Sequence, residues 1–283
     1  MASTRDIKRR KASVTSTGQI TKAMKLVSTV KLQKAKSRAE EAKPYFSNLY
    51  QTITSMLARS DEDVKEKYRS GNPDGKTAVI VITSNRGLAG GYNQNVIKLV
   101  TEANLDPKKT WIYALGRKGA EGLAKRGFEI KQDLSDVINS PLYSDATNLS
   151  RDLMAAYEAG EIKEIKVAFT IFRNTVSHVP TMLRLLPTDE FSDDGDVDLL
   201  MNFEPSPDEA LARIMPKYVT GEIYGAIMES VASENGARMQ AMDNATNNAE
   251  EMVSKLELAY NRARQGAITQ ELTEIIAGAN AIN

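Results

Sequence analysis

The sequence contains no cysteine, one histidine and no long apolar run, and each of these absences excludes a class of protein. Without cysteine there is no disulfide bond, no thiolate nucleophile and no cysteine-ligated metal. A lone His178 cannot build the usual zinc sites, and it fits no Ser/His/Asp arrangement, so we expect a surface or strand residue. The longest apolar stretch, AVIVI at 78–82, is far shorter than the roughly 18 residues of a membrane span.

Basic residues are scarce in some segments and acidic residues in others, although the net charge is zero. Residues 1–45 contain 12 basic and 3 acidic residues, whereas residues 187–210 contain 9 acidic residues and no basic one. Residues 217–283 contain 5 basic and 9 acidic residues. If the two ends of the chain pair, about five positive charges at the N-terminal end stay unanswered. This imbalance predicts an acidic partner outside the chain.

The N-terminal segment has a helical period from about Thr4 to Ala58. A proline inside such a helix forces a kink or a local break, so we expect a bend near Pro44. The apolar residues that recur at steps of three and four are Ile20, Met24, Val27, Val30, Phe46, Leu49, Ile53 and Met56. This spacing is typical of a helix and not of a strand.

The C-terminal segment has no proline after Pro216, and a heptad can be counted from Met228 to Gly266. A heptad of this length predicts a coiled coil, here with a small, Met-rich seam that Asn235 and Arg238 interrupt. Neither terminal helix has a wide enough apolar face to be stable alone, so we expect the two to pair antiparallel. The a and d positions are Met228, Val231, Asn235, Arg238, Met242, Ala245, Ala249, Met252, Leu256, Ala259, Ala263 and Gly266.

The middle of the chain alternates short apolar strands with helical stretches, which predicts a mostly parallel, Rossmann-like sheet. The expected strands are Lys76–Thr83, Thr110–Leu115 and Glu164–Phe172, with Val176–Leu186 as an antiparallel edge strand. The expected helices lie near Tyr92–Ala103, Arg117–Arg126 and Asp145–Ala159.

The predicted fold class is therefore α/β, with a long antiparallel two-helix coiled coil and a central Rossmann-like sheet domain. The expected domains are 1–60 (N-terminal coiled-coil helix), 61–75 (linker), 76–207 (α/β domain) and 208–283 (C-terminal coiled-coil helix).

Four short motifs could carry chemistry, and each has a simpler structural interpretation. SNRGLAGGYN at 84–93 could cradle phosphate, but it matches neither G-x-G-x-x-G nor a P-loop, so we expect a tight turn set by Gly87 and Gly90. GRKG at 116–119 is typical of a surface turn. The aspartates at 193–198 lack the spacing of an EF-hand. KRRK at 8–11 could bind nucleic acid, but no nucleic-acid-binding fold accompanies it.

Four segments together resemble the gamma subunits of F-type ATP synthases. GQITKAMKLVSTVKLQKA at 18–35 resembles the N-terminal signature of that family. SENGARMQAMDNATNNAEE at 233–251 and NRARQGAITQELTEIIAGANA at 261–281 resemble its C-terminal signature. SNRGLAGGYN resembles the first βα turn of the family, with Ala89 at a position often held by cysteine.

The resemblance implies a non-catalytic central stalk that couples ion flow through the membrane sector to ATP synthesis or hydrolysis by rotation. Its implied partners are the alpha and beta subunits of the catalytic ring, the epsilon subunit and the c-subunit ring, on the cytoplasmic face of the cell membrane. No cofactor, metal, catalytic residue or nucleic acid is implied. The implied contacts with the ring are Lys22, Met24, Lys25, Arg238, Gln265, Thr269 and Glu271.

Two other functions remain open from the sequence. An enzyme with a nucleotide site on the Rossmann-like domain would bind ATP or a dinucleotide as the purified chain. A coiled-coil nucleic-acid or scaffold protein would show DNA binding that weakens steeply with salt.

Overall fold

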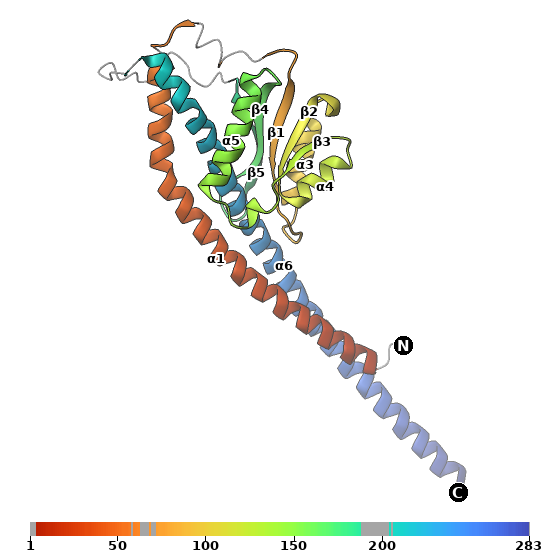
Figure 1. Ribbon diagram of the computed structural model, residues 1–283. Coiled ribbons are helices and arrows are strands. Elements are labelled where there is room, and N and C mark those ends of the chain that lie inside the picture. Colours follow the sequence, from red (N-terminus) through yellow and green to blue (C-terminus); the bar gives the residue numbers. More distant parts are fainter. Residues whose placement is uncertain are drawn as a thin grey trace. The chain divides into compact units, whose positions relative to one another are not determined.

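A computed structural model describes residues 4–57, 59–62, 68, 72–187, 204 and 206–282 of the chain (Figure 1). These residues form two compact units. One unit combines residues 1–28 with residues 239–283, and the other comprises residues 29–238. Each of the two terminal helices contributes to both units. In the described parts of the chain, none of the helices has the length and hydropathy that crossing a bilayer requires.

The larger unit is built on a five-stranded sheet in the order β3-β2-β1-β4-β5. The first four strands run parallel, and β5 pairs antiparallel with β4 at the edge. This confirms the mostly parallel sheet and its antiparallel edge strand. The strands are β1 (Lys76–Ile82), β2 (Thr110–Leu115), β3 (Glu129–Asp133), β4 (Ile162–Phe172) and β5 (His178–Leu186).

Helices cover both faces of the sheet, which explains why the central strands are apolar without alternation. On one face α3 (Tyr92–Glu102) and α4 (Arg117–Ala124) pack through Val96, Ile97 and Leu123. The opposite face packs against α5 (Tyr143–Glu158) and against parts of α1 (Thr4–Leu57) and α6 (Pro207–Ile282). Two short 3-10 helices, Pro107–Lys109 and Val137–Asn139, complete the connections.

The terminal helices run without interruption through their prolines. Pro44 lies inside α1 and Pro216 inside α6. The expected local break at Pro44 is therefore absent, and the bend there stays a prediction. The apolar residues after Pro44 do form a packing face, because Leu49, Ile53 and Met56 are buried in the core.

One strand was not expected from the sequence. β3 reads EIKQD, a mainly polar segment at the second edge of the sheet. It follows α4 closely and pairs only with β2. An edge strand keeps much of its surface in water, so it carries little of the apolar signal by which strands are recognised.

Candidate functional site: the helix pair and the carboxyl end of the sheet

In the smaller unit, α1 and α6 run antiparallel. The ammonium group of Lys25 lies 2.5 Å from the carboxylate of Asp243, and that of Lys11 lies 2.9 Å from Glu257. As the residue number rises along one helix, it falls along the other. A Cβ atom placed on Gly18 would lie 3.3 Å from the Cβ of Ala249, between these two ion pairs. The predicted antiparallel pairing is therefore confirmed within this unit.

The face of α1 that packs in this unit differs from the one that its apolar period predicts. Ile20 and Val27 are each 58% exposed, whereas Thr21 and Ser28 are buried. The residues turned inward recur at steps of three and four, and they are Thr4, Ile7, Lys11, Val14, Gly18, Thr21, Lys25 and Ser28. The period is helical as predicted, and small and polar residues form the contact in place of the large apolar ones.

The heptad on α6 is correspondingly shifted. The predicted a positions Met242 and Ala249 are buried, but the d position Met252 is 42% exposed. Thr246 and Val253, which are e positions in the same heptad count, are buried and half-buried. The packed seam therefore uses the predicted a and e positions, a choice that the approach of α1 decides.

The residues expected to contact a ring partner from α1 have different surroundings. Lys22 is exposed and Met24 is half-buried. Lys25 also touches the solvent, but its ammonium group already pairs with Asp243. Among the described residues, Lys22 has no ion pair, so it is the one of the two lysines whose charge is available without disturbing the helix pair.

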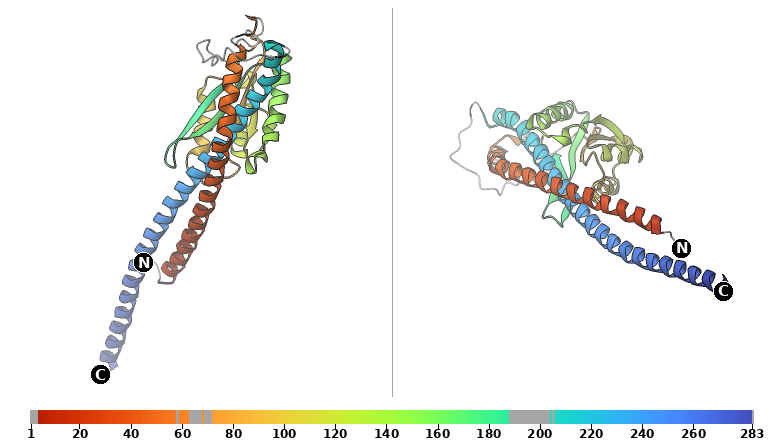
Figure 2. Two further views of the ribbon diagram at one scale, coloured as in Figure 1. Left: turned by 90° about the vertical axis from the view of Figure 1, so that its left-hand side faces the viewer. Right: turned by 90° about the horizontal axis from the view of Figure 1, so that it is seen from below.

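On α6 the expected contacts Gln265, Thr269 and Glu271 are all exposed. The Thr269 hydroxyl donates to the carbonyl oxygen of Gln265, 2.9 Å away within the same helix. Large apolar side chains on the same part of α6 are exposed as well, namely Ile268, Leu272, Ile275 and Ile276. Within its unit, α6 continues past the start of α1 (Figure 2), so this stretch has no helical neighbour there.

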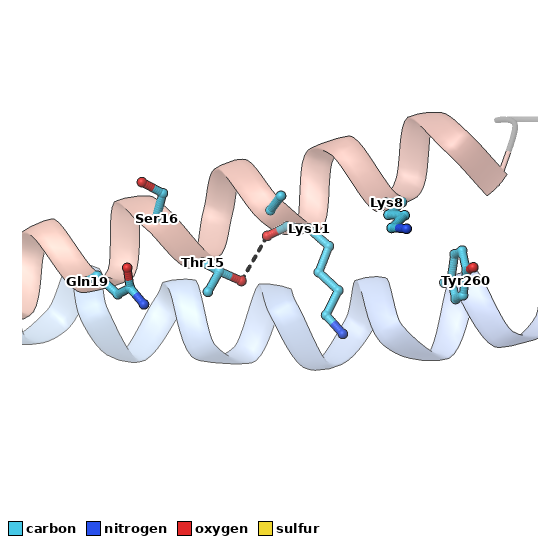
Figure 3. Close-up of a pocket in the computed structure, with 7 residues that line it drawn as sticks. Lys8, Lys11, Thr15, Ser16, Gln19 and Tyr260 are labelled. Atoms are coloured by element: carbon cyan, nitrogen blue, oxygen red, sulfur yellow. Dashed lines mark hydrogen bonds between the residues drawn. The ribbon is translucent and has the colours of Figure 1, made fainter.

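A groove of about 500 Å³ opens along the helix pair (Figure 3). Lys8 and Lys11 give it two amines, and Tyr260 closes one end. The Thr15 hydroxyl is turned back to the carbonyl oxygen of Lys11. The amine of Lys11 is engaged with Glu257.

At the carboxyl end of the sheet, the glycine-rich turn after β1 uses its polar groups internally. Asn93 accepts from the amide of Ser84 at 2.9 Å. The first amides of α4 are also satisfied within the chain. Asn85 accepts from the Arg117 amide, and the Thr83 hydroxyl oxygen accepts from the Gly119 amide. Three amides at this end of the sheet, those of Ser84, Arg117 and Gly119, are therefore already engaged and do not await a phosphate.

Only one of the two glycines expected to set this turn is required by its backbone. Gly90 has φ +56°, a left-handed conformation that favours glycine. Gly87 lies outside that region, and a Cβ there would meet open space, so the expectation for Gly87 was wrong. Gly116, at the start of α4, is the more constrained residue, because a Cβ there would lie 2.1 Å from the carbonyl oxygen of Thr83.

Arg238 lies against this turn. Its guanidinium is 2.6 Å from Glu234, and the two side chains are only 12% and 15% exposed. The second guanidinium nitrogen is 3.5 Å from the carbonyl oxygen of Arg86 and 3.4 Å from that of Gly87. Arg238 is thus mainly occupied inside the chain, unlike the exposed contacts on α6.

His178 begins β5, as a strand histidine. Its Nε2 atom is buried without a hydrogen-bond partner among the described residues, and burial lowers the pKa of the imidazole. Within the described part of the chain, no three His, Cys, Asp or Glu residues are grouped as metal ligands would be. The aspartates at 193–198 lie outside the described residues.

Sequence reasoning missed three polar residues of α6, Glu229, Ser230 and Ser233, which bond to the backbone of β4. They fall between heptad seam positions, where a coiled coil would expose them. The available signal was the density of hydroxyl and carboxyl groups in SVASEN at 230–235, which is unusual for a seam.

Comparison with known proteins gives matches along the whole chain. A family profile described as ATP synthase matches residues 3–282. The ATP synthase gamma chain of Lachnoclostridium phytofermentans is 58% identical over 292 residues, covering 100% of both chains. The gamma chain of Alkaliphilus metalliredigens is 40% identical over 283 residues, covering 98% of each.

The fold is also found among solved structures. The rotor of the Euglena gracilis mitochondrial ATP synthase in rotational state 1 contains a similar chain, with a TM-score of 0.69 and 18% identity. That match covers 94% of this chain and 98% of the other. At this level of identity it shows a shared fold and nothing finer.

Proposed function

We infer that this chain, which belongs to the ATP synthase gamma-chain family, is the non-catalytic central stalk subunit of an F-type ATP synthase. The observation that carries this function is the full-length match at 58% identity to a gamma chain, with no part of either chain left over. The chain couples ion flow through the membrane sector to ATP synthesis or hydrolysis by rotation. The bonds of ATP are made and broken on other subunits.

The helix pair suits a part that transmits twist and also slides against its neighbours. Its seam brings Gly18 close to Ala249 and places Thr21 against Thr246, so the helices approach closely. Two ion pairs cross the seam, and such exposed pairs are worth only about 0–1 kcal/mol each. The two helices of such a stalk are held together by their close approach rather than by a thick apolar core. Contact with the surrounding ring stabilises the pair further.

The proposed partners are the alpha and beta subunits of the catalytic ring, the epsilon subunit and the c-subunit ring. The exposed positions of Lys22 on α1 and of Gln265, Thr269 and Glu271 on α6 support contacts with the ring. Met24 and Lys25 belong to the same proposed surface at half-buried positions. Arg238 also belongs to the proposed set, although its contacts with Glu234 leave it little surface.

As part of the ATP synthase complex, the chain is proposed to act at the cytoplasmic face of the cell membrane. The proposed domain limits are 1–60 and 208–283 for the helices, 61–75 for the linker and 76–207 for the α/β domain.

Site-directed cross-linking gives a direct test, because a chain without native cysteine accepts single cysteines cleanly. Lys22→Cys and Gln265→Cys should each cross-link to a ring subunit in complexes purified from native membranes. Arg151→Cys, on the exposed surface of α5, is the matched control and should give no ring product.

The same preparation tests the two other functions. Co-purification with alpha, beta and epsilon subunits is the expected result. Saturable ATP binding by the purified chain alone would favour a nucleotide-dependent enzyme. Salt-sensitive DNA binding with no ring subunits present would favour a nucleic-acid or scaffold protein.

A further inference from the structure

The strand β4 is longer than its parallel neighbour β1. The last paired residues are Val81 of β1 and Ala168 of β4. Beyond that point Thr170 and Phe172 still pair with β5 on their other side. Their amides and carbonyls on the β1 side have no strand to bond, and buried backbone groups without partners are costly.

Three side chains of α6 take the place of the missing strand. The Thr170 amide donates to the Ser230 hydroxyl oxygen at 3.4 Å, and the Ser233 hydroxyl donates to the Thr170 carbonyl oxygen at 3.0 Å. The Phe172 amide donates to the Glu229 carboxylate at 3.1 Å. Both serines are fully buried. The helix therefore continues the hydrogen-bonding of the sheet through its side chains.

The same segment of α6 meets two further loops of the sheet domain. Glu234 and Arg238 form a largely buried ion pair against the carbonyl groups of the turn after β1. Gly236 permits close approach to the start of β5, because a Cβ there would lie 2.8 Å from His178 Nε2 and 3.0 Å from the Phe172 ring.

These contacts gather at one particular place in the sheet. The chain moves from β1 outward to β2 and β3, then returns to the other side of β1 to form β4. Beyond the carboxyl ends of the strands, the crevice at such a switch point is where open α/β sheets generally bind ligands. In this chain, side chains from Glu229 to Arg238 of α6 occupy it, and Figure 1 shows α6 passing that end of β4.

We propose that Glu229–Arg238 is a positioning joint that fixes the sheet domain to α6, so that torque applied to the sheet domain passes into this helix. The segment fills the switch-point crevice as a ligand would and leaves α6 no freedom to turn about its own axis relative to the sheet. Its residues from Ser233 to Arg238 open the segment that resembles the C-terminal signature of the family, and they serve contacts within the chain. The proposal rests on the proposed stalk function.

The test uses the assembled ATP synthase in inverted membrane vesicles. The variant Ser230→Ala/Ser233→Ala leaves both backbone groups of Thr170 without partners. Hydrogen exchange at Thr170 should accelerate by about threefold to tenfold, the range expected for losing a buried hydrogen bond. ATP hydrolysis per assembled complex should persist, while ATP-driven ion pumping per ATP hydrolysed should be lost in part. Ser254→Ala is the matched control, because the Ser254 hydroxyl bonds only to the Glu250 carbonyl of its own helix.

A second pair of variants tests the proposal if the double variant folds poorly. Glu229→Gln keeps an oxygen that can accept from the Phe172 amide, so it should retain coupling, whereas Glu229→Ala should reduce it. Faster exchange with unchanged pumping per ATP would overturn the torque role and leave a purely structural contact. Unchanged exchange in all variants would overturn the joint itself. Hydrogen exchange is measured independently of ion pumping. If the chain is not a stalk subunit, the membrane vesicles will lack it, and that outcome is distinct from a failure of the joint.

Discussion

The hydroxyl oxygens of Thr21 and Thr246 lie 2.7 Å apart, buried between α1 and α6. Each hydroxyl also lies within bonding distance of a carbonyl oxygen on its own helix, that of Gly18 at 3.0 Å and that of Met242 at 2.8 Å. A hydroxyl has one proton, so only one of the two threonines donates across the seam while the other donates along its helix. This pair is the polar centre of an otherwise small-residue contact.

Replacing either threonine of this pair by valine should destabilise the helix pair by about 0.5–1.5 kcal/mol. The cost is modest because the remaining hydroxyl still has a carbonyl acceptor on its own helix. The double variant Thr21→Val/Thr246→Val should cost less than the sum of the singles, since two methyl groups then meet where two hydroxyls did. Chemical unfolding of the four proteins gives the coupling energy. Strict additivity would show that the two hydroxyls do not interact.

Charge reversal should separate Lys22 from Lys25. Lys25→Glu places a carboxylate beside Asp243 and should loosen the helix pair, whereas Lys22→Glu should leave it intact. Adding Asp243→Lys to Lys25→Glu should restore the ion pair in the opposite sense and recover assembly. For Lys22→Glu we expect normal assembly, persistent ATP hydrolysis and less ion pumping per ATP.

Both activities of the lysine variants should be measured in membrane vesicles at low and high salt, because screening weakens exposed charge contacts. Unchanged coupling of Lys22→Glu at low ionic strength would show that this lysine does not face an acidic partner.

Three glycines of the sheet domain should rank in their tolerance of alanine. Gly116→Ala should prevent folding, since the new methyl group would overlap the Thr83 carbonyl. Gly90→Ala should cost about 1–2 kcal/mol, the penalty of a left-handed conformation for other residues. Gly87→Ala should change stability by less than about 0.5 kcal/mol, as is usual for open surface positions. Thermal unfolding of the three proteins checks the order, and equal losses at Gly87 and Gly90 would contradict it.

His178 should make the sheet domain sensitive to acid. Burial lowers its pKa from the ordinary value of 6.5, so the unfolded chain binds this proton more readily than the folded chain. The stability that the neutral imidazole of His178 contributes to the folded chain is therefore fully present above this pH. It declines as the pH falls below it. His178→Asn should flatten this decline.

The unfolding midpoints of the parent chain and the His178→Asn variant, compared at about pH 7.5 and about pH 5.5, would reveal the effect. An equal loss of stability in both proteins would assign the acid sensitivity to other groups.

The sequence by itself was sufficient to predict that the main elements exist and in which order they follow. The apolar runs of β1 and β4 are buried on both faces, so their sequences admit little other than a central strand. The long helices were recognisable because their three- and four-residue periods extend over many turns. The motifs at both ends of the chain were long enough to indicate the family, which the full-length matches then showed.

The tertiary structure decided which side chains those elements use. Ile20 and Val27 suggested the packing face of α1, yet the contact with α6 is made by Thr21 and Gly18, because close approach favours small side chains over a large apolar stripe. Ser230 and Ser233 have a structural role only because β4 extends beyond β1. The backbone amide and carbonyl of Thr170 then need hydrogen-bond partners, which these two side chains of α6 provide. These hydrogen bonds join segments far apart in the chain, so the polar residues at 230–235 could be seen in the sequence but their partners on β4 could not.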